Sequence, residues 1–431
     1  MLEFFQIFFS FLLFLLITSV PFNIFNSNFY VSKNTSTLGI ASFNLILNCN
    51  ILLILSILPV SLNFYNWPII FLYLIIFIYI YLVKSLKIKL IKNFFQTLVV
   101  FFFVYAIIST NVAVELDLGW DAKYFYYIKA LFFIENQNFY DLDKFIYNSW
   151  HPHLGSYFWA FFWNLMPIKL EYFGRLFYVY LLCFSMLFVC HNNSKEKFLD
   201  SIIFILVILF FYFYERFSGL QEILIFSFLV ILSKYFSELI NVKNKYYILF
   251  IILGCNLIIW IKAEGIVYSC ILILLLNFSK HVSKKIKNQL NITYLALILL
   301  KIIIYKFSNL TLNAQPYYFG YISEMNFELL IYKLKFILPY LLYYSVNNVF
   351  FISGIIILFV LTMQKKGDDY TKLLNYYFLF NFIFIFCAYL LRDMEIEHSV
   401  KATMERIVFT SSGFYVFLVV NFVKNLGKRI K

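Results

Sequence analysis

The chain has 431 residues, of which 63% are hydrophobic and only 13% charged, and its mean hydropathy is +0.83. No water-soluble fold buries that fraction of apolar residues, so a soluble protein is excluded and the bilayer must act as solvent. The formal charge of +13 would fit nucleic-acid binding in a soluble protein, but here the lysines cluster in short loops between apolar runs. Because cytoplasmic loops of membrane proteins show this distribution, we expect membrane lipids and not nucleic acid as partners.

Apolar runs of roughly 16–25 residues recur along the chain and predict transmembrane helices. Barrel strands would show shorter runs that alternate in polarity. The sequence therefore predicts an all-α polytopic membrane protein with about thirteen transmembrane helices. The predicted spans are 4–25, 39–60, 68–83, 93–114, 169–190, 201–217, 222–240, 246–261, 265–279, 291–307, 338–362, 375–391 and 407–423.

Four basic clusters predict the orientation of these spans. They lie at 84–92, 280–287, 365–372 and 424–431. The positive-inside rule places all four clusters in the cytoplasm. Two segments on the same side must be separated by an even number of spans, and the predicted spans between successive clusters meet this condition. The N-terminus is then outside and the C-terminus is cytoplasmic.

In this orientation the remaining segments lie on the outer side of the membrane. They carry most of the acidic and histidine residues whose role is not simply to make a loop soluble. Such a collection is what an active site at a membrane surface would produce, although outer loops that merely lack lysine would explain part of it. The outer segments are 115–168, 216–222, 262–265, 308–337 and 392–406.

The first long outer loop, 115–168, contains two stretches with helical character. Residues 121–131 place Tyr124, Tyr127, Ile128 and Leu131 on one stripe, which predicts a helix lying along the membrane interface with this aromatic face in the headgroups. The run 154–167 is too short to span comfortably, so we expect an interfacial or re-entrant helix there.

Asp117 and Asp121 lie where the chain leaves the predicted span 93–114. Asp121 at the start of a helix would be favoured by the helix dipole and could act as a general base. Alternatively, the two carboxylates could hold a divalent cation, Mg or Mn, together with a phosphate. A third reading is a helix cap and a solvated loop acid, and Gly119 between the two aspartates favours a turn.

His151 and His153 flank Pro152, so they do not have the i, i+4 spacing of a helical metal pair. They could hydrogen-bond a phosphate or a sugar hydroxyl, although structural histidines are more common. Charged residues at the outer ends of spans often only extend toward water. The further candidates for substrate binding at such positions are Glu222, Lys262 and Glu264.

His398, Lys401, Glu405 and Arg406 have the spacing of one helical face that leads into the last span. A basic and histidine face would suit an anionic lipid headgroup; the alternative is a solvated helix face. The six cysteines lie in or at the edges of apolar runs and read as small buried hydrophobes. The sequence has no glycine-rich phosphate loop, HExxH or GxSxG motif, so nucleotide hydrolysis is not expected.

The order of four short motifs resembles the GT-C glycosyltransferases, multi-span enzymes that use polyprenyl-phosphate-linked sugars. The motifs are W-D-A-K-Y with Asp121, W-H-P-H-L-G at 150–155, K-A-E-G at 262–265, and E-I-E-H-S-V-K-A-T-M-E-R at 395–406. The resemblance implies N-terminal transmembrane helices at 1–92 and a GT-C-like catalytic core at 93–431 with the outer loop 115–168.

By this resemblance the protein is a bacterial plasma-membrane enzyme that transfers a sugar from a polyprenyl phosphate to a glycan or lipid acceptor on the outer face. Asp121 would be the base, and Lys262, Lys401 and Arg406 would contact the leaving phosphate. One rival is a lipid-linked saccharide flippase, for which Lys301 inside a predicted span is the main sequence sign. Another is an O-antigen-polymerase-like or ligase-like enzyme.

Overall fold

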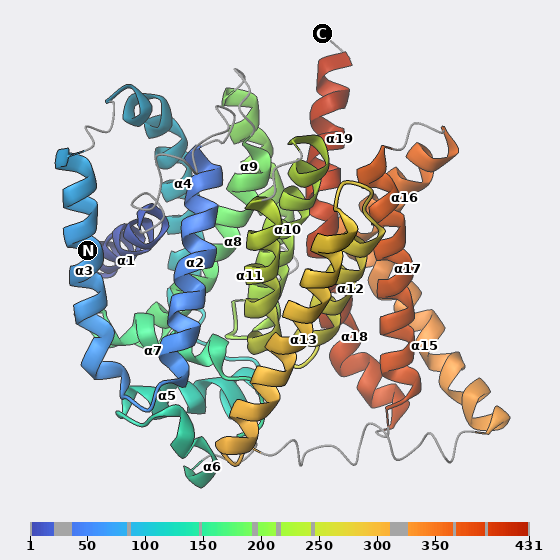
Figure 1. Ribbon diagram of the computed structural model, residues 1–431, viewed down its shortest axis with the longest axis horizontal. Coiled ribbons are helices and arrows are strands. Elements are labelled where there is room, and N and C mark those ends of the chain that lie inside the picture. Colours follow the sequence, from blue (N-terminus) through green and yellow to red (C-terminus); the bar gives the residue numbers. More distant parts are fainter. Residues whose placement is uncertain are drawn as a thin grey trace. The chain divides into compact units, whose positions relative to one another are not determined.

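The computed structural model describes residues 2–20, 37–83, 88–145, 149–191, 197–212, 217–242, 246–310, 326–364, 368–392 and 395–429. All regular structure within these ranges is helical, which confirms the predicted all-α class (Figure 1). The chain forms two compact units, one of Met1–Tyr147 and Pro152–Ser227, the other of Asn148–His151 and Phe228–Lys431. The predicted boundary between residues 92 and 93 falls inside the first unit.

The first unit is built around α8, in which every residue from Tyr172 to Cys190 is buried. A helix that is apolar on all sides is stable only when it is enclosed, and α8 contacts α1, α2, α4, α7 and α9. Hydroxyl contacts join α1 to this group, for example Thr18 to Tyr180 at 3.0 Å. The helices of the unit are α1 (Leu2–Ser19), α2 (Thr37–Ile57), α3 (Leu62–Val83), α4 (Ile88–Val114), η2 (Ala122–Tyr127), α5 (Ile128–Ile134), η3 (Phe139–Asp141), α6 (Leu142–Phe145), α7 (Leu154–Asn164), α8 and α9 (Lys197–Tyr212).

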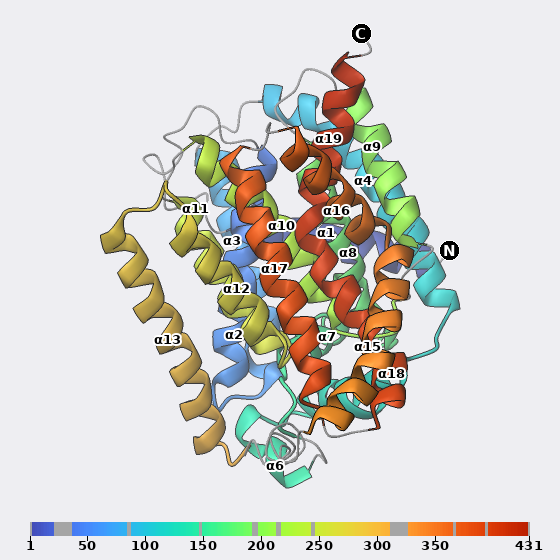
Figure 2. The same cartoon turned by 90° about the vertical axis from the view of Figure 1, so that its right-hand side faces the viewer.

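The second unit packs α17 against α12 on one side and against α18 on another (Figure 2). α15 also lies along α18, and α13 contacts the α11–α12 hairpin. α10 (Glu222–Val242) begins in the first unit and continues in the second. The other helices are α11 (Tyr246–Ile261), α12 (Gly265–Phe278), α13 (Lys284–Phe307), α15 (Phe327–Asn347), α16 (Val349–Met363), α17 (Asp369–Leu390), α18 (Ile396–Ser412), η5 (Gly413–Tyr415) and α19 (Val416–Arg429).

By length and composition, nine helices in the described ranges could cross a membrane. This supports a multi-pass helical membrane protein with fewer full-length spans than the thirteen or so expected. The difference arises because several apolar runs form helices of only 10–17 residues. These shorter helices are Glu3–Ser19, Phe198–Phe210, Tyr246–Ile261, Gly265–Phe278 and Val349–Met363.

The predicted span 338–362 is not one helix. It divides at Asn348, whose side-chain oxygen accepts the Phe351 N–H at 2.9 Å and so begins α16. α15 begins at Phe327, inside the predicted outer loop 308–337, and residues 311–325 of that loop lie outside the described ranges.

The last span is longer than predicted, because the 392–406 segment is helical from Ile396 onward and leads directly into the 407–423 run. The apolar stretch Ile396–Leu426 has 31 residues, which corresponds to about 46 Å of helix. A hydrocarbon core is about 30 Å thick, so at least one end of this path extends beyond it. The path is interrupted at η5.

Candidate functional site

The loop of residues 115–121, called here the aspartate loop, connects α4 to η2 in the first unit. Asp117 is exposed and Asp121 is half-buried. Asp121 directly precedes η2, but its side chain does not cap that helix. η2 is a π-helix, a rare geometry that is found frequently at functional sites. The predicted helix is thus confirmed, with Tyr124 and Ile128 of the predicted stripe exposed.

The aspartate loop is held by the 217–222 turn. Gly119 donates its backbone N–H to the carbonyl oxygen of Ser218 at 2.9 Å. Gly219 has φ +83°, and a Cβ there would lie 2.7 Å from the Trp159 ring, so both its conformation and its packing require glycine. The turn leads into Glu222, the buried first residue of α10, where a carboxylate is favoured by the helix dipole.

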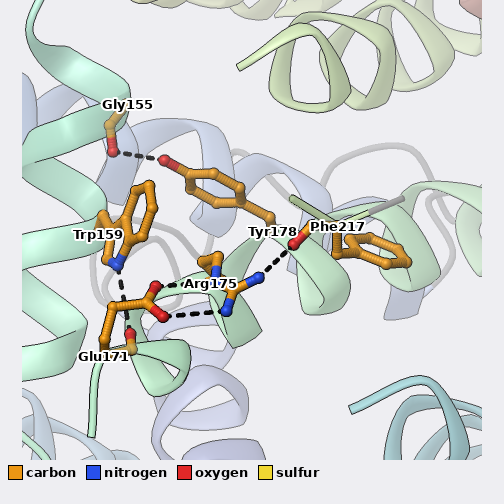
Figure 3. A network of polar contacts seen from close by, with 6 residues as sticks. All are labelled: Gly155, Trp159, Glu171, Arg175, Tyr178 and Phe217. Atoms are coloured by element: carbon orange, nitrogen blue, oxygen red, sulfur yellow. Dashed lines mark hydrogen bonds and ion pairs between the residues drawn. The ribbon is translucent and has the colours of Figure 1, made fainter. Parts of the chain in front are cut away.

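A network of buried hydrogen bonds holds the 217–222 turn in place (Figure 3). Arg175 donates from Nη1 to the Phe217 carbonyl oxygen at 2.7 Å, and from Nε and Nη2 to the two carboxylate oxygens of Glu171 at 2.8 and 2.9 Å. The Trp159 indole N–H donates to the Glu171 carbonyl oxygen at 3.2 Å, and the Tyr178 hydroxyl donates to that of Gly155 at 2.8 Å. We call these residues the Arg175 network; it joins α7, α8 and the turn.

The charge of Glu171 in the Arg175 network affects the pKa of a tyrosine in η2, the helix that follows Asp121. Burial raises the pKa of Glu171, and the Arg175 guanidinium opposes that rise. The Tyr127 ring of η2 stacks on Trp163, with 6.0 Å between ring centroids. Burial, and to a lesser degree the Glu171 charge, raises the pKa of Tyr127. The π-helix and the Arg175 network therefore form one electrostatic environment.

Lys129 in α5 is fully buried, although it lies outside the candidate spans. Burial lowers the pKa of its amine to about 7. A lysine is rarely buried in a segment that lies outside the candidate spans. Its amine gives the 115–168 segment a group that titrates near neutral pH.

The two histidines lie in different surroundings. His153 is fully buried, its Nε2 lies 2.8 Å from the Ser56 hydroxyl, and its ring packs on Phe139 at 4.4 Å. These contacts describe a core residue that joins the start of α7 to α2. His151 belongs to the second unit, and its ring stacks on Trp150 at 3.8 Å.

Among the described residues, no three His, Cys, Asp or Glu side chains gather in a group that could hold a metal ion. A divalent cation at Asp117 and Asp121 would have two carboxylates at most. Mg²⁺ and Mn²⁺ accept such sites when substrate phosphate oxygens and water complete the coordination.

In the second unit, the turn between α11 and α12 carries Lys262 and Glu264, whose charged groups lie 3.4 Å apart. Gly265 is required there because a Cβ would collide with the Ile258 carbonyl oxygen. Lys301 of α13 donates to the carbonyl oxygen of Ile259 at 2.7 Å. This buried amine therefore supports the end of α11 from which the turn begins.

A second group of side chains surrounds the end of α17. Arg392 donates to the Thr403 hydroxyl oxygen at 3.0 Å, and the Tyr389 hydroxyl lies 2.8 Å from the same oxygen. Tyr389 is also within electrostatic reach of Glu264 and Arg406. We call these five residues the arginine cluster. Lys333 donates to the carbonyl oxygens of Leu390 and Arg392 at 2.8 and 2.9 Å, which stabilises the C-terminus of α17.

The predicted basic face of α18 divides into two. His398, Lys401 and Glu405 are exposed, and Lys401 pairs with Glu397 at 2.6 Å. Arg406 lies about 80° around the helix from His398, because each residue advances the helix by about 100°. Arg406 belongs to the arginine cluster. Of the four residues of the predicted face, it alone lies in the same cluster as Glu264.

Several of the residues described above were not singled out from the sequence, among them the charged residues Lys129, Glu171, Arg175 and Arg392. Arg175 carries a detectable signal, since it lies inside an apolar run four residues after Glu171. Lys129 lies on the side of the helix opposite the aromatic stripe. Its burial depends on tertiary packing, which the sequence pattern does not show.

No family model, curated protein or solved structure matches this chain. Function is therefore inferred from the chemistry of these residues.

Proposed function

We propose that this chain is a membrane glycosyltransferase of GT-C type that moves a sugar from a polyprenyl-phosphate donor to a glycan or lipid acceptor. Asp121 acts as the general base. This role is best supported by the way the aspartate loop is held: the Gly119 N–H is hydrogen-bonded to the Ser218 carbonyl oxygen, and a π-helix follows Asp121. A base works only when its carboxylate is held close to the reacting hydroxyl, and rigid backbone contacts supply that positioning.

In the proposed reaction, the Asp121 carboxylate accepts the proton of the acceptor hydroxyl. The hydroxyl oxygen forms a bond to the anomeric carbon, and the bond from that carbon to the phosphate oxygen breaks with inversion. The phosphate leaves with the electron pair and needs cationic partners.

For the donor, we propose that the arginine cluster binds the phosphate. Arg392 uses one of its guanidinium N–H groups on Thr403, and a guanidinium can offer two parallel hydrogen bonds to a phosphate. Lys262 adds a point charge, which the nearby Glu264 carboxylate partly neutralises. Glu264 accepts a hydrogen bond from a sugar hydroxyl. Lys401 is less suited, because Glu397 already offsets its charge.

The proposal includes the bacterial plasma membrane as location, an outer N-terminus, a cytoplasmic C-terminus and about thirteen spans. Helices shorter than the hydrocarbon core, such as α9 and α11, would cross by local thinning of the bilayer.

A flippase for lipid-linked saccharides is the second candidate. It is favoured by Lys301, buried inside a candidate span, and by the interruption of the last span at η5, since transporters carry ionisable residues and broken helices at membrane depth.

The test uses purified full-length protein and radiolabelled polyprenyl-phosphate sugars. Asp121→Asn keeps the shape of the side chain but cannot accept the proton, so transfer should fall on the order of 10²–10⁴-fold while donor binding persists. Asp117→Asn should cost less. Near-normal turnover of Asp121→Asn would overturn the assignment. Translocation without transfer would favour the flippase, and transfer only from lipid-linked oligosaccharides would favour a polymerase-like enzyme.

A further inference from the structure

The last span is interrupted within its apolar stretch. α18 ends at Ser412, the 3₁₀ turn η5 follows, and α19 begins at Val416. Three consecutive hydroxyl residues precede the interruption, and each donates to a carbonyl oxygen three or four residues back. These bonds run from Thr410 to Arg406 at 2.7 Å, from Ser411 to Val408 at 2.9 Å, and from Ser412 to Phe409 at 2.7 Å.

Two tyrosines from neighbouring helices donate to the same stretch. The Tyr268 hydroxyl of α12 donates to the Ile407 carbonyl oxygen at 3.1 Å, and the Tyr377 hydroxyl of α17 donates to that of Ser411 at 2.9 Å. A hydroxyl has one proton and two lone pairs. Since the protons of all five hydroxyls are directed to backbone carbonyls, their oxygens have only lone pairs left to offer.

Asn381 faces this stretch from α17. It lies one turn after Tyr377 and two turns before Tyr389, and both of these tyrosines bond to α18. Asn381 is fully buried, and neither its amide oxygen nor its amide nitrogen has a hydrogen-bond partner. The buried Tyr415 hydroxyl of η5 also has no partner. An amide left in this way in an apolar core costs several kcal/mol, so its presence calls for an explanation, of which a bound ion is one.

The chemistry of the surroundings selects the ligand. The stretches 374–389 and 407–415 contain no charged residue. Without carboxylates, a divalent cation is disfavoured, and an anion would find few donors. Neutral carbonyl and hydroxyl oxygens on an interrupted helix are the ligands that bind alkali cations in channels and transporters.

We propose that the interruption of the last span binds a single alkali cation, Na⁺ or K⁺, through Asn381 and the hydroxyl oxygens of Tyr415, Tyr377 and Ser411. Because Asn381 and Tyr415 are completely buried, the proposed ion would be enclosed by protein. The site is independent of the glycosyltransferase proposal, since it involves neither the aspartate loop nor the arginine cluster.

The experiment measures thermal unfolding of the full chain in nanodiscs. Choline chloride is replaced stepwise by NaCl or KCl at constant ionic strength. We expect a saturable rise in Tm of about 2–6 °C with at least one of the two cations. A flat response to both would overturn the proposal, and so would a rise that never saturates.

Asn381→Leu provides the matched variant, because it removes the amide at similar volume. It should raise Tm in choline, since an amide without partners is lost, and it should abolish the cation response. A purely structural asparagine would instead lower Tm in choline. Asn375→Leu is the control on the same helix, where the amide nitrogen already donates to Thr362 at 3.2 Å; it should keep the response.

If Asn381→Leu does not fold, Tyr415→Phe removes only a hydroxyl, and binding of ²²Na⁺ and ⁸⁶Rb⁺ to the unmodified protein is measured directly. Saturable binding that weakens at least ten-fold in Tyr415→Phe supports the site. Unchanged binding in that variant, or none in the unmodified protein, contradicts it.

Discussion

The backbone N–H of Gly119 and the carbonyl oxygen of Ser218 lie 2.9 Å apart, across almost one hundred residues of chain. This single hydrogen bond joins the loop that carries both candidate aspartates to the turn that leads into Glu222. Because Arg175 holds the neighbouring Phe217 carbonyl oxygen, the position of Asp121 depends on the Glu171–Arg175 ion pair at the start of α8.

Gly219→Ala should destabilise the first unit by about 2–4 kcal/mol, because alanine at positive φ is strained and its Cβ would press on Trp159. Displacement of the 217–222 turn should also reduce transfer. The measurements are Tm in detergent and the rate with labelled donor. Ser218→Ala keeps the backbone acceptor and should behave like the unmodified protein; equal effects of the two substitutions would contradict the role of Gly219.

Arg175→Met should lower the free energy of unfolding by about 3–5 kcal/mol, since it leaves the largely buried Glu171 carboxylate and the Phe217 carbonyl oxygen without their donor. The Asp141–Lys144 pair has the same 2.8 Å separation, but its lysine is 67% exposed whereas Arg175 is 1% exposed, and it serves as the control. Lys144→Met should change stability by about 0–1 kcal/mol. Comparable losses in both variants would show that burial of the Arg175 network does not matter.

Lys129 predicts a pH dependence of stability. The pKa of its amine is about 7 in the folded protein, against about 10.4 in an unfolded chain. Between these values the unfolded state binds more protons, so the free energy of unfolding rises with pH. From pH 7 to pH 9 the gain attributable to Lys129 is on the order of 2 kcal/mol.

Lys129→Met should remove that gain, which is measured as the difference between its Tm–pH curve and that of the unmodified protein. The exposed Lys123, six residues earlier, is the control, and Lys123→Met should leave the slope unchanged. A slope that persists in Lys129→Met would mean that another group titrates.

Arg406→Ala should weaken binding of the lipid donor by about 1.5–3 kcal/mol, the loss expected when charge-assisted hydrogen bonds are given up. Arg406→Lys and Arg392→Lys should retain part of the affinity, because lysine offers a point charge without the planar fork. The readout is the apparent KM for the donor. Lys401→Ala, outside the arginine cluster, should leave it unchanged, and an unchanged KM in Arg406→Ala would contradict the phosphate role.

The proposed orientation predicts which loops are accessible from outside. Single cysteines replace the exposed Asp143 in the 115–168 loop and the exposed Lys285 in the 280–287 cluster, after removal of Cys270 and Cys387, the native cysteines that are not buried. An impermeant maleimide applied to intact cells should label the first position only. Labelling at position 285 would reverse the assignment of sides.

The sequence predicts the helices better than it predicts their boundaries. Apolar runs locate them because lipid and protein cores both require satisfied backbone groups, but the run 338–362 conceals the cap at Asn348, a local hydrogen bond that hydropathy does not detect. For the candidate site, W-D-A marks the start of a helical segment and K-A-E-G marks a turn. The pairing of Lys401 with Glu397 has the i, i+4 spacing of a helical ion pair, which the sequence does display. Burial of Lys129 follows from packing, which the spacing of residues does not specify.

The burial of α7 has a consequence for biogenesis. Its eleven residues make about 16 Å of helix, too short to cross the hydrocarbon core, yet all of them are buried. The translocon therefore has no full-length segment to release into lipid at Leu154–Asn164. α7 is enclosed by contacts with α2, α3, α5 and α8, so it must dock after α8 has been synthesised and inserted. Assembly of the first unit is thus ordered, with spans integrated during translation and α7 seated afterwards.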